Sequence, residues 1–190
     1  MKKGINKANK LEKAFSLLES GSGRNDLCVF LSHKSEDKVS ARKIADYLRD
    51  AGIDYYLDEL DDALQQAAFA KDPLAVTESI KKGIRESTHM LVIVSAVTFD
   101  SPWIPFEIGF GHAAIGTHAH RLALLTLKSA ADLPLPDFMR TAYDIRGTKS
   151  LNVYISGITG LNESLLKAET RIFAHSTRNH VLDDVLKWNA

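Results

Sequence analysis

The sequence predicts an α/β fold, in which a parallel β-sheet is covered by helices on both faces. Short apolar runs, typical of strands buried on both sides, alternate along the chain with segments whose apolar residues recur every three or four positions, as in helices. The 190 residues, of which 45% are hydrophobic and 25% charged, are enough for one such domain and too few for two.

Five apolar runs are the predicted strands. They are Leu27–Ser32, Ile53–Leu57, His89–Ser95, Arg121–Leu127 and Tyr143–Gly147. Because strands that alternate with helices pair in parallel, we expect one sheet covered on both faces. Five strands favour the flavodoxin-like order 2-1-3-4-5, in which ligands bind beyond the carboxyl ends of the strands, at the switch point between the first and third.

The predicted helices cover 5–20, 35–52, 77–87, 103–115 and 162–188, the last with a break at 175–179. Ser35 is the expected cap of the second helix, and Gly52 ends it. Residues 58–76 form a connection so long that we expect it to be functional or partly helical. The predicted organisation is an N-terminal helix and linker (1–23), the α/β domain (26–150) and a C-terminal helical extension packed on it (151–190).

Composition narrows the classes of function. Lys plus Arg and Asp plus Glu both number 24, so the chain lacks the basic excess of a general nucleic-acid binder. No apolar run approaches the roughly 20 residues that span a membrane, and Cys28 is the only cysteine, which excludes internal disulfides and thiolate zinc sites. His118 and His120 have no acid beside them, so we expect no metal. A cytoplasmic protein fits these features.

The stretch from Ser101 to Gly111 places Glu107 among aromatic residues and glycines, directly after the third predicted strand. Glu107 is either the acid of a ligand pocket or a carboxylate that complements the dipole at the start of its helix. Trp103 lies one helical turn earlier on the same face, as a wall of the site or as a core aromatic. Close packing of helix on sheet explains Gly109 and Gly111 better than a dinucleotide motif does.

Further candidate residues lie near the same switch point. Phe30 belongs to the core or stacks on a base, and Ser32 caps the next turn or binds a ribose or phosphate oxygen. His33 and Lys34 are the nearest cations and therefore candidates to bind a pyrophosphate. Asp58 binds a ribose hydroxyl or caps the following loop.

Five segments in this order resemble a bacterial TIR (Toll/interleukin-1 receptor) domain over residues 26–150. They are Val29–Asp37, Ala41–Leu48, Tyr56–Glu59, Leu91–Ser95 and Trp103-x-x-x-Glu107. The resemblance implies a flavodoxin-like fold and the cleavage or cyclisation of NAD+ that many bacterial members catalyse. The chain departs from the family in the connection after Asp58, which lacks the common glycine-containing loop, and at His33 and Lys34, where some members carry basic pairs.

The chain resembles the stand-alone TIR proteins of anti-phage systems such as Thoeris. This implies an NAD+ nucleosidase or ADP-ribosyl cyclase with Glu107 as the catalytic residue and NAD+ as substrate rather than cofactor. A cyclic ADP-ribose derivative is favoured as the signal to a separate effector, and the chain is expected to associate with itself through TIR–TIR contacts. Two alternatives remain, a non-catalytic TIR scaffold and an enzyme like the nucleoside deoxyribosyltransferases, which also use a Glu on a similar fold.

Overall fold

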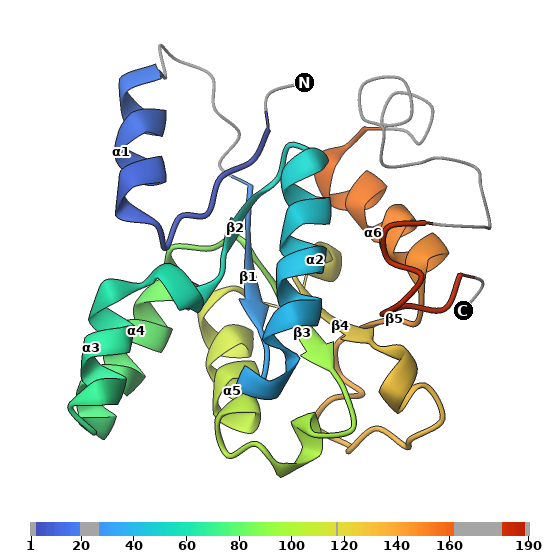
Figure 1. Cartoon of the computed structure of the whole chain (residues 1–190). Helices are drawn as coiled ribbons and strands as arrows, with labels where there is room; N and C mark the ends of the chain where they lie inside the picture. The colour runs from blue at the N-terminus through green and yellow to red at the C-terminus, as the bar shows by residue number, and fades with distance from the viewer. Residues whose placement is uncertain (1–2, 20–26, 117, 162–179, 189–190) are drawn as a thin grey trace.

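The computed structural model describes residues 3–19, 27–116, 118–161 and 180–188. Its centre is an all-parallel five-stranded sheet in the order β2-β1-β3-β4-β5, which confirms the predicted flavodoxin-like fold (Figure 1). The strands are β1 (Cys28–Ser32), β2 (Asp54–Tyr56), β3 (His89–Val94), β4 (Leu122–Thr126) and β5 (Tyr143–Ile145). The helices are α1 (Lys10–Glu19), α2 (Lys38–Asp50), α3 (Asp62–Phe69), α4 (Pro73–Arg85), α5 (Trp103–Ala114) and α6 (Thr148–Thr159).

Helices cover both faces of the sheet, and each face has its own apolar core. Leu91 and Ile93 of β3 pack with α2 and α6, whereas Met90 and Val92 pack with α4 and α5. Successive side chains of a strand point to opposite faces, and here both faces are buried. For that reason the central strands read as continuous apolar runs rather than as alternating patterns.

The prediction of a helix over 5–20 is wrong at its start. Helix α1 begins at Lys10, and the preceding residues run extended along β2, where Asn6 forms a parallel bridge with Tyr55. The backbone groups on the edge of β2 bind this segment, and the Asn9 side chain then accepts a hydrogen bond from the Leu11 amide in the first turn of α1. Leu11 is 70% exposed, so its side chain does not pack on the domain.

Asp residues cap the two helices that follow β2, and the first of these helices confirms that the 58–76 connection is partly helical. The 58–76 connection contains α3, whose first amides are capped by Asp61, and α4 begins at Pro73 rather than Thr77, capped by Asp72. Ser35 does not cap α2. It opens a short 3-10 turn, and its hydroxyl donates to Glu36.

The end of the chain also differs from the expected helical extension. None of the predicted helix ranges covers α6, which lies mostly within the expected 151–190 extension and packs Leu151 and Tyr154 into the core beside β5. Residues 162–179 of the predicted helix lie outside the described residues, and 180–188 form turns rather than a helix. Leu182 and Leu186 from these turns are fully buried, so this segment completes the core over α2 and α6.

The two glycines of α5 give a prediction with an internal control. A Cβ on Gly111 would lie 2.6 Å from Sδ of the fully buried Met90, whereas a Cβ on Gly109 meets nothing within 4 Å. We expect Gly111→Ala to destabilise the fold by about 1–3 kcal/mol through overpacking. Gly109→Ala should stabilise it by about 0.5–1 kcal/mol through helix propensity. Urea unfolding measures both, and equal shifts of the two midpoints would contradict close packing at Gly111.

Candidate functional site

The site is centred on Glu107, a buried acid in the second turn of α5. Only 7% of Glu107 is exposed, and its Oε2 accepts a short hydrogen bond from the hydroxyl of Ser32, the last residue of β1. The carboxyl group therefore contacts the carboxyl end of a central strand. It lies past the first turn of α5, so complementing the amides at the helix start does not explain its position.

The surroundings of Glu107 favour its neutral form. Burial raises the pKa of this carboxyl to about 8, and the charge of nearby Asp58 acts in the same direction. The hydrogen bond from Ser32 opposes both because it stabilises the carboxylate. An acid so far from its ordinary pKa, beside the ends of parallel strands, is the usual mark of a functional carboxyl group.

His33 and Asp58 form a second pair beside this acid. Nδ1 of His33 lies 3.9 Å from Oδ1 of Asp58, and the His33 side chain is only 5% exposed. Burial raises the pKa of Asp58, while the neighbouring His33 lowers it. Residues from the ends of β1 and β2 and from α5 are thus brought together as the topology predicted: Ser32, His33, Asp58 and Glu107.

The other three predicted site residues lie in different environments. Phe30 is 4% exposed and stacks on Tyr56, with ring centroids 5.6 Å apart, inside the core beneath α4 and α5. Trp103 is 36% exposed and packs edge-on against Phe106. The Lys34 ammonium lies 3.3 Å from a carboxylate oxygen of Glu36.

A polar contact that was not predicted joins the two loops of the switch point. The Ser95 hydroxyl, directly after β3, donates to Oδ2 of Asp37 at 2.5 Å, and the Ser95 amide donates to the Thr98 hydroxyl at 2.8 Å. The connections after β1 and β3 are therefore fixed to each other. The sequence offers one signal for the Ser95–Asp37 hydrogen bond: both residues follow the carboxyl ends of neighbouring strands, β3 and β1.

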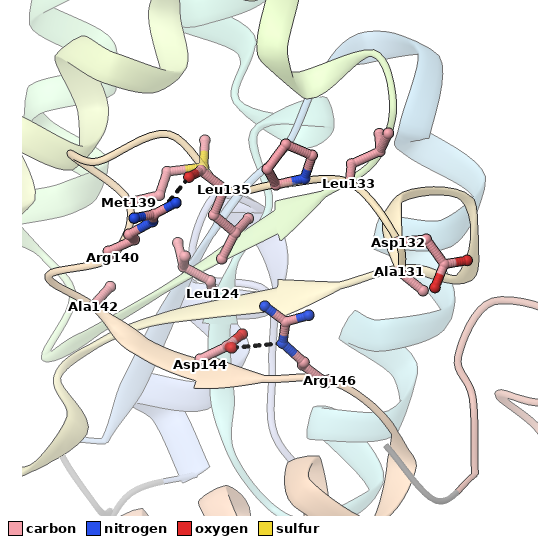
Figure 2. A pocket seen from close by; sticks show the side chains of 11 residues that line it. Leu124, Ala131, Asp132, Leu133, Leu135, Met139, Arg140, Ala142, Asp144 and Arg146 are labelled. Carbon is pink, nitrogen blue, oxygen red and sulfur yellow. Dashed lines mark hydrogen bonds and ion pairs between the residues drawn. The ribbon is translucent and has the colours of Figure 1, made fainter.

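A pocket of about 510 Å³ lies at the carboxyl ends of β4 and β5, and none of the predicted site residues lines it (Figure 2). Leu124 and Met139 form part of an apolar lining. Arg146 is paired with Asp144 at 2.7 Å, and Arg140 lies 3.4 Å from Asp137. Each of the two arginines in the lining therefore has an acidic neighbour.

Within the ranges that the structure describes, no helix is long and apolar enough to cross a bilayer. In the same ranges, no three His, Cys, Asp or Glu side chains gather in a way that could hold a metal ion.

A family model for the TIR domain matches residues 29–153. The matched segment contains all of β2 to β5 and nearly all of β1, and it includes Ser32, Asp58 and Glu107. TIR domains commonly associate with one another, and some of them are NAD+ hydrolases. The match covers well over half of the chain and agrees with the order of the strands. The chain therefore belongs to the TIR domain family.

Proposed function

We propose that this protein cleaves the nicotinamide–ribose bond of NAD+, with Glu107 as the only acid that the reaction requires. The observation that carries the proposal is the buried carboxyl of Glu107, hydrogen-bonded to Ser32 at the carboxyl edge of the sheet. Parallel α/β sheets bind their ligands at this edge.

One acid suffices because of the leaving group. When the C1′–N1 bond breaks, its electron pair passes to the pyridinium nitrogen, and nicotinamide leaves as a neutral molecule without needing a proton. A glycosidase that expels an alkoxide requires a second carboxyl group as general acid. Here the enzyme has only to stabilise the positive charge that develops on the ribose, which one buried carboxylate does strongly in a site of low dielectric.

The raised pKa of Glu107 fits a carboxyl that ionises in response to its substrate. In the free protein, a pKa of about 8 keeps the group mostly neutral at pH 7. The pyridinium ring of NAD+ carries a positive charge, and an opposite charge within a few ångströms lowers the pKa of a carboxyl. Substrate binding would therefore generate the carboxylate, and the Ser32 hydrogen bond would stabilise it.

The remaining candidates take roles around this centre. Ser32 and Asp58 bind ribose hydroxyls, and Trp103, which is partly exposed one turn before Glu107, walls the nicotinamide subsite. His33 and Lys34 bind the pyrophosphate, because Glu36 and Asp37 already occupy the start of the following helix.

Phe30 supports the floor of the site from the core, through its stacking on Tyr56. At C1′ the departing nicotinamide is replaced by the oxygen of a water molecule, which loses a proton and gives ADP-ribose, or by a nucleophilic atom of the same ADP-ribose unit, which gives the favoured cyclic derivative. In the role we propose, this product acts in the cytoplasm as a signal to a separate effector protein in anti-phage defence. The chain works as an assembly of copies joined by TIR–TIR contacts.

A second candidate function is a TIR scaffold without catalysis. It is favoured by large apolar side chains at the junction of α3 and α4, where Phe69 is 92% exposed and Leu74 is 71% exposed. Such residues are typical of a surface that associates with a partner. A scaffold explains this surface but gives no reason to bury an acid against Ser32.

Nicotinamide release from NAD+ separates the two functions. The full chain is incubated with NAD+ over a range of protein concentrations, and assembled protein collected by sedimentation is assayed separately. We expect nicotinamide and an ADP-ribose derivative in equal amounts, identified by chromatography and mass spectrometry. Assemblies that form and sediment but release no nicotinamide would overturn the enzymatic proposal in favour of the scaffold.

A further inference from the structure

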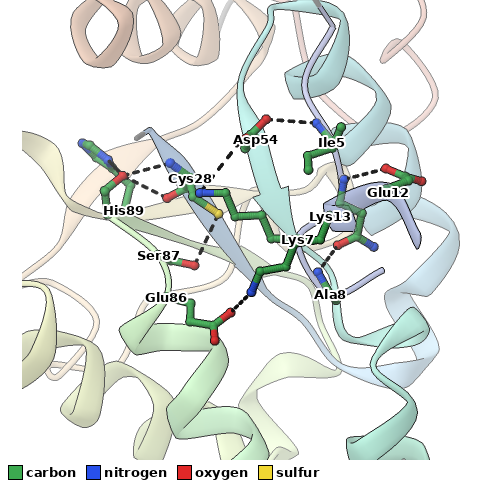
Figure 3. A network of polar contacts seen from close by, with 12 residues as sticks. Ile5, Lys7, Ala8, Glu12, Lys13, Cys28, Asp54, Glu86, Ser87 and His89 are labelled. Carbon is green, nitrogen blue, oxygen red and sulfur yellow. Dashed lines mark hydrogen bonds and ion pairs between the residues drawn. The ribbon is translucent and has the colours of Figure 1, made fainter. Parts of the chain in front are cut away.

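Residues 4–8, which precede α1, lie outside the matched TIR residues and pair with the outer edge of β2. The Tyr55 amide donates to the Ile5 carbonyl at 2.9 Å, and the Lys7 amide donates to the Tyr55 carbonyl at 2.7 Å. Figure 3 shows Ile5 beside Asp54 of β2, whose carboxylate accepts from the Ile5 amide at 3.1 Å. A Cβ on Gly4 would lie 1.9 Å from the Ile53 carbonyl oxygen, so the backbones approach as closely there as a glycine allows.

Asn6 is the one side chain of this segment that binds both backbone groups of Leu57, the residue directly after β2. Its Nδ2 donates to the Leu57 carbonyl at 3.1 Å, and its Oδ1 accepts from the Leu57 amide at 3.1 Å. The same Oδ1 accepts from the Ala8 amide, and Asn6 is only 2% exposed. The Asn6 side chain thus makes with Leu57 the two hydrogen bonds that the backbone of a neighbouring strand would make, one residue beyond the end of β2.

Leu57 directly precedes Asp58, which is the first residue of a short 3-10 turn. The carboxylate of Asp58 lies 3.9 Å from Nδ1 of His33. Within the turn, the Asp61 amide donates to the Asp58 carbonyl at 2.9 Å. The turn is therefore held at its start by Asn6 and at its end by its own hydrogen bond. Loss of the Asn6 side chain releases the start of this turn. The backbone at the start of the turn determines where the Asp58 carboxylate points.

We propose that Asn6 is a positioning residue of the substrate site, which fixes the backbone of Leu57 and thereby holds Asp58 beside His33 in the place where NAD+ binds. This inference rests on the proposed function for its substrate. It also assigns a role in the site to a segment that precedes the TIR match of residues 29–153.

The test compares Asn6→Ala with Asn152→Ala in the full chain. Asn152 is 5% exposed and accepts a hydrogen bond from Tyr47 at 2.7 Å between α2 and α6, so its loss removes a buried amide of the same kind without touching Leu57. Hydrogen exchange at the Leu57 and Asp61 amides and the KM and kcat of nicotinamide release are measured for both variants and the wild type.

In Asn6→Ala, we expect exchange at Leu57 and Asp61 to become at least about tenfold faster, because the Leu57 amide loses its partner and the start of the turn that the Asp61 amide closes is released. Exchange in β1 and β3 should stay as in the wild type. We expect KM for NAD+ to rise about fivefold or more while kcat changes little, since binding contacts are displaced and the acid is not. Asn152→Ala should leave both the exchange of this turn and KM unchanged.

Two results for the Asn6→Ala variant itself would overturn the proposal. One is exchange at Leu57 and Asp61 in Asn6→Ala that matches the wild type, and the other is faster exchange with an unchanged KM. Equal effects in Asn152→Ala would mean that Asn6 is only a structural residue, which also contradicts it. A wild-type chain that releases no nicotinamide would contradict the proposed function instead, and hydrogen exchange alone would then decide whether Asn6 holds the turn.

Discussion

Glu107→Gln is expected to be more stable than the wild-type chain at pH 8 and above, although it removes the proposed catalytic residue. The wild-type carboxyl is buried, and burial raises its pKa from 4.5 to about 8. Above pH 8 the folded protein must therefore hold a buried carboxylate. Glutamine has nearly the same shape and an oxygen that can still accept the Ser32 hydrogen bond, but it carries no charge.

The sign follows from proton linkage. Between pH 4.5 and 8 the unfolded chain has lost the Glu107 proton while the folded chain keeps it, so the wild-type free energy of unfolding falls as the pH rises through this window. At 1.36 kcal/mol per pKa unit, the full loss is on the order of 5 kcal/mol. Glu107→Gln has no such group, so its stability should lack this part of the decline.

Urea unfolding at pH 5 and pH 8 measures the difference. The wild type and Glu107→Gln should diverge as the pH rises, with the variant more stable at pH 8. Glu78→Gln provides the matched control, because Glu78 is an exposed glutamate of α4. It should follow the wild type through the whole range. Parallel pH profiles for the wild type and Glu107→Gln would show that the carboxyl does not ionise in a buried environment.

The same substitution should abolish turnover of NAD+. Loss of one electrostatic group that faces the developing charge typically costs about 10²–10³ in kcat. Since Glu107→Gln keeps the shape and the Ser32 contact, this loss should occur without loss of folding or of assembly. Nicotinamide release is compared at equal protein concentration and equal sedimented fraction, and release within about threefold of the wild type, a difference below 1 kcal/mol, would contradict the role of Glu107.

Most of the fold could be predicted because its signals are local. The central strands are buried on both faces, and their runs of apolar residues, such as Met90 to Val94, have no other simple explanation in a chain of this length. Alternation with helices then determines the parallel pairing and the switch point. That topology was enough to predict that Ser32, Asp58 and Glu107 would lie near one another.

The features that the sequence did not predict are mostly contacts between residues that lie far apart along the chain. Asn6 reads as part of an amphipathic helix until the edge of β2 is present, because its partner Leu57 is 51 residues away. The Ser95–Asp37 hydrogen bond likewise joins residues 58 apart. The start of α4 was a different kind of error, because Asp72 before Pro73 is a local helix-start signal that could have been read.

The environment of the acid also could not be derived from sequence. The pattern allowed Glu107 to be a carboxylate at the helix start or the centre of a pocket, since both place it near the beginning of α5. Only the packing of α5 on the end of β1 shows that its side chain is directed inward to Ser32 and away from solvent.

The central claim is that Glu107 is the single acid that cleaves NAD+, and its most direct test is nicotinamide release by assembled wild type, Glu107→Gln and Glu78→Gln, measured side by side by chromatography. We expect release by the wild type and by Glu78→Gln at similar rates, and a rate about 10²–10³ lower for Glu107→Gln in assemblies of equal size. Equal release by all three chains would contradict the claim.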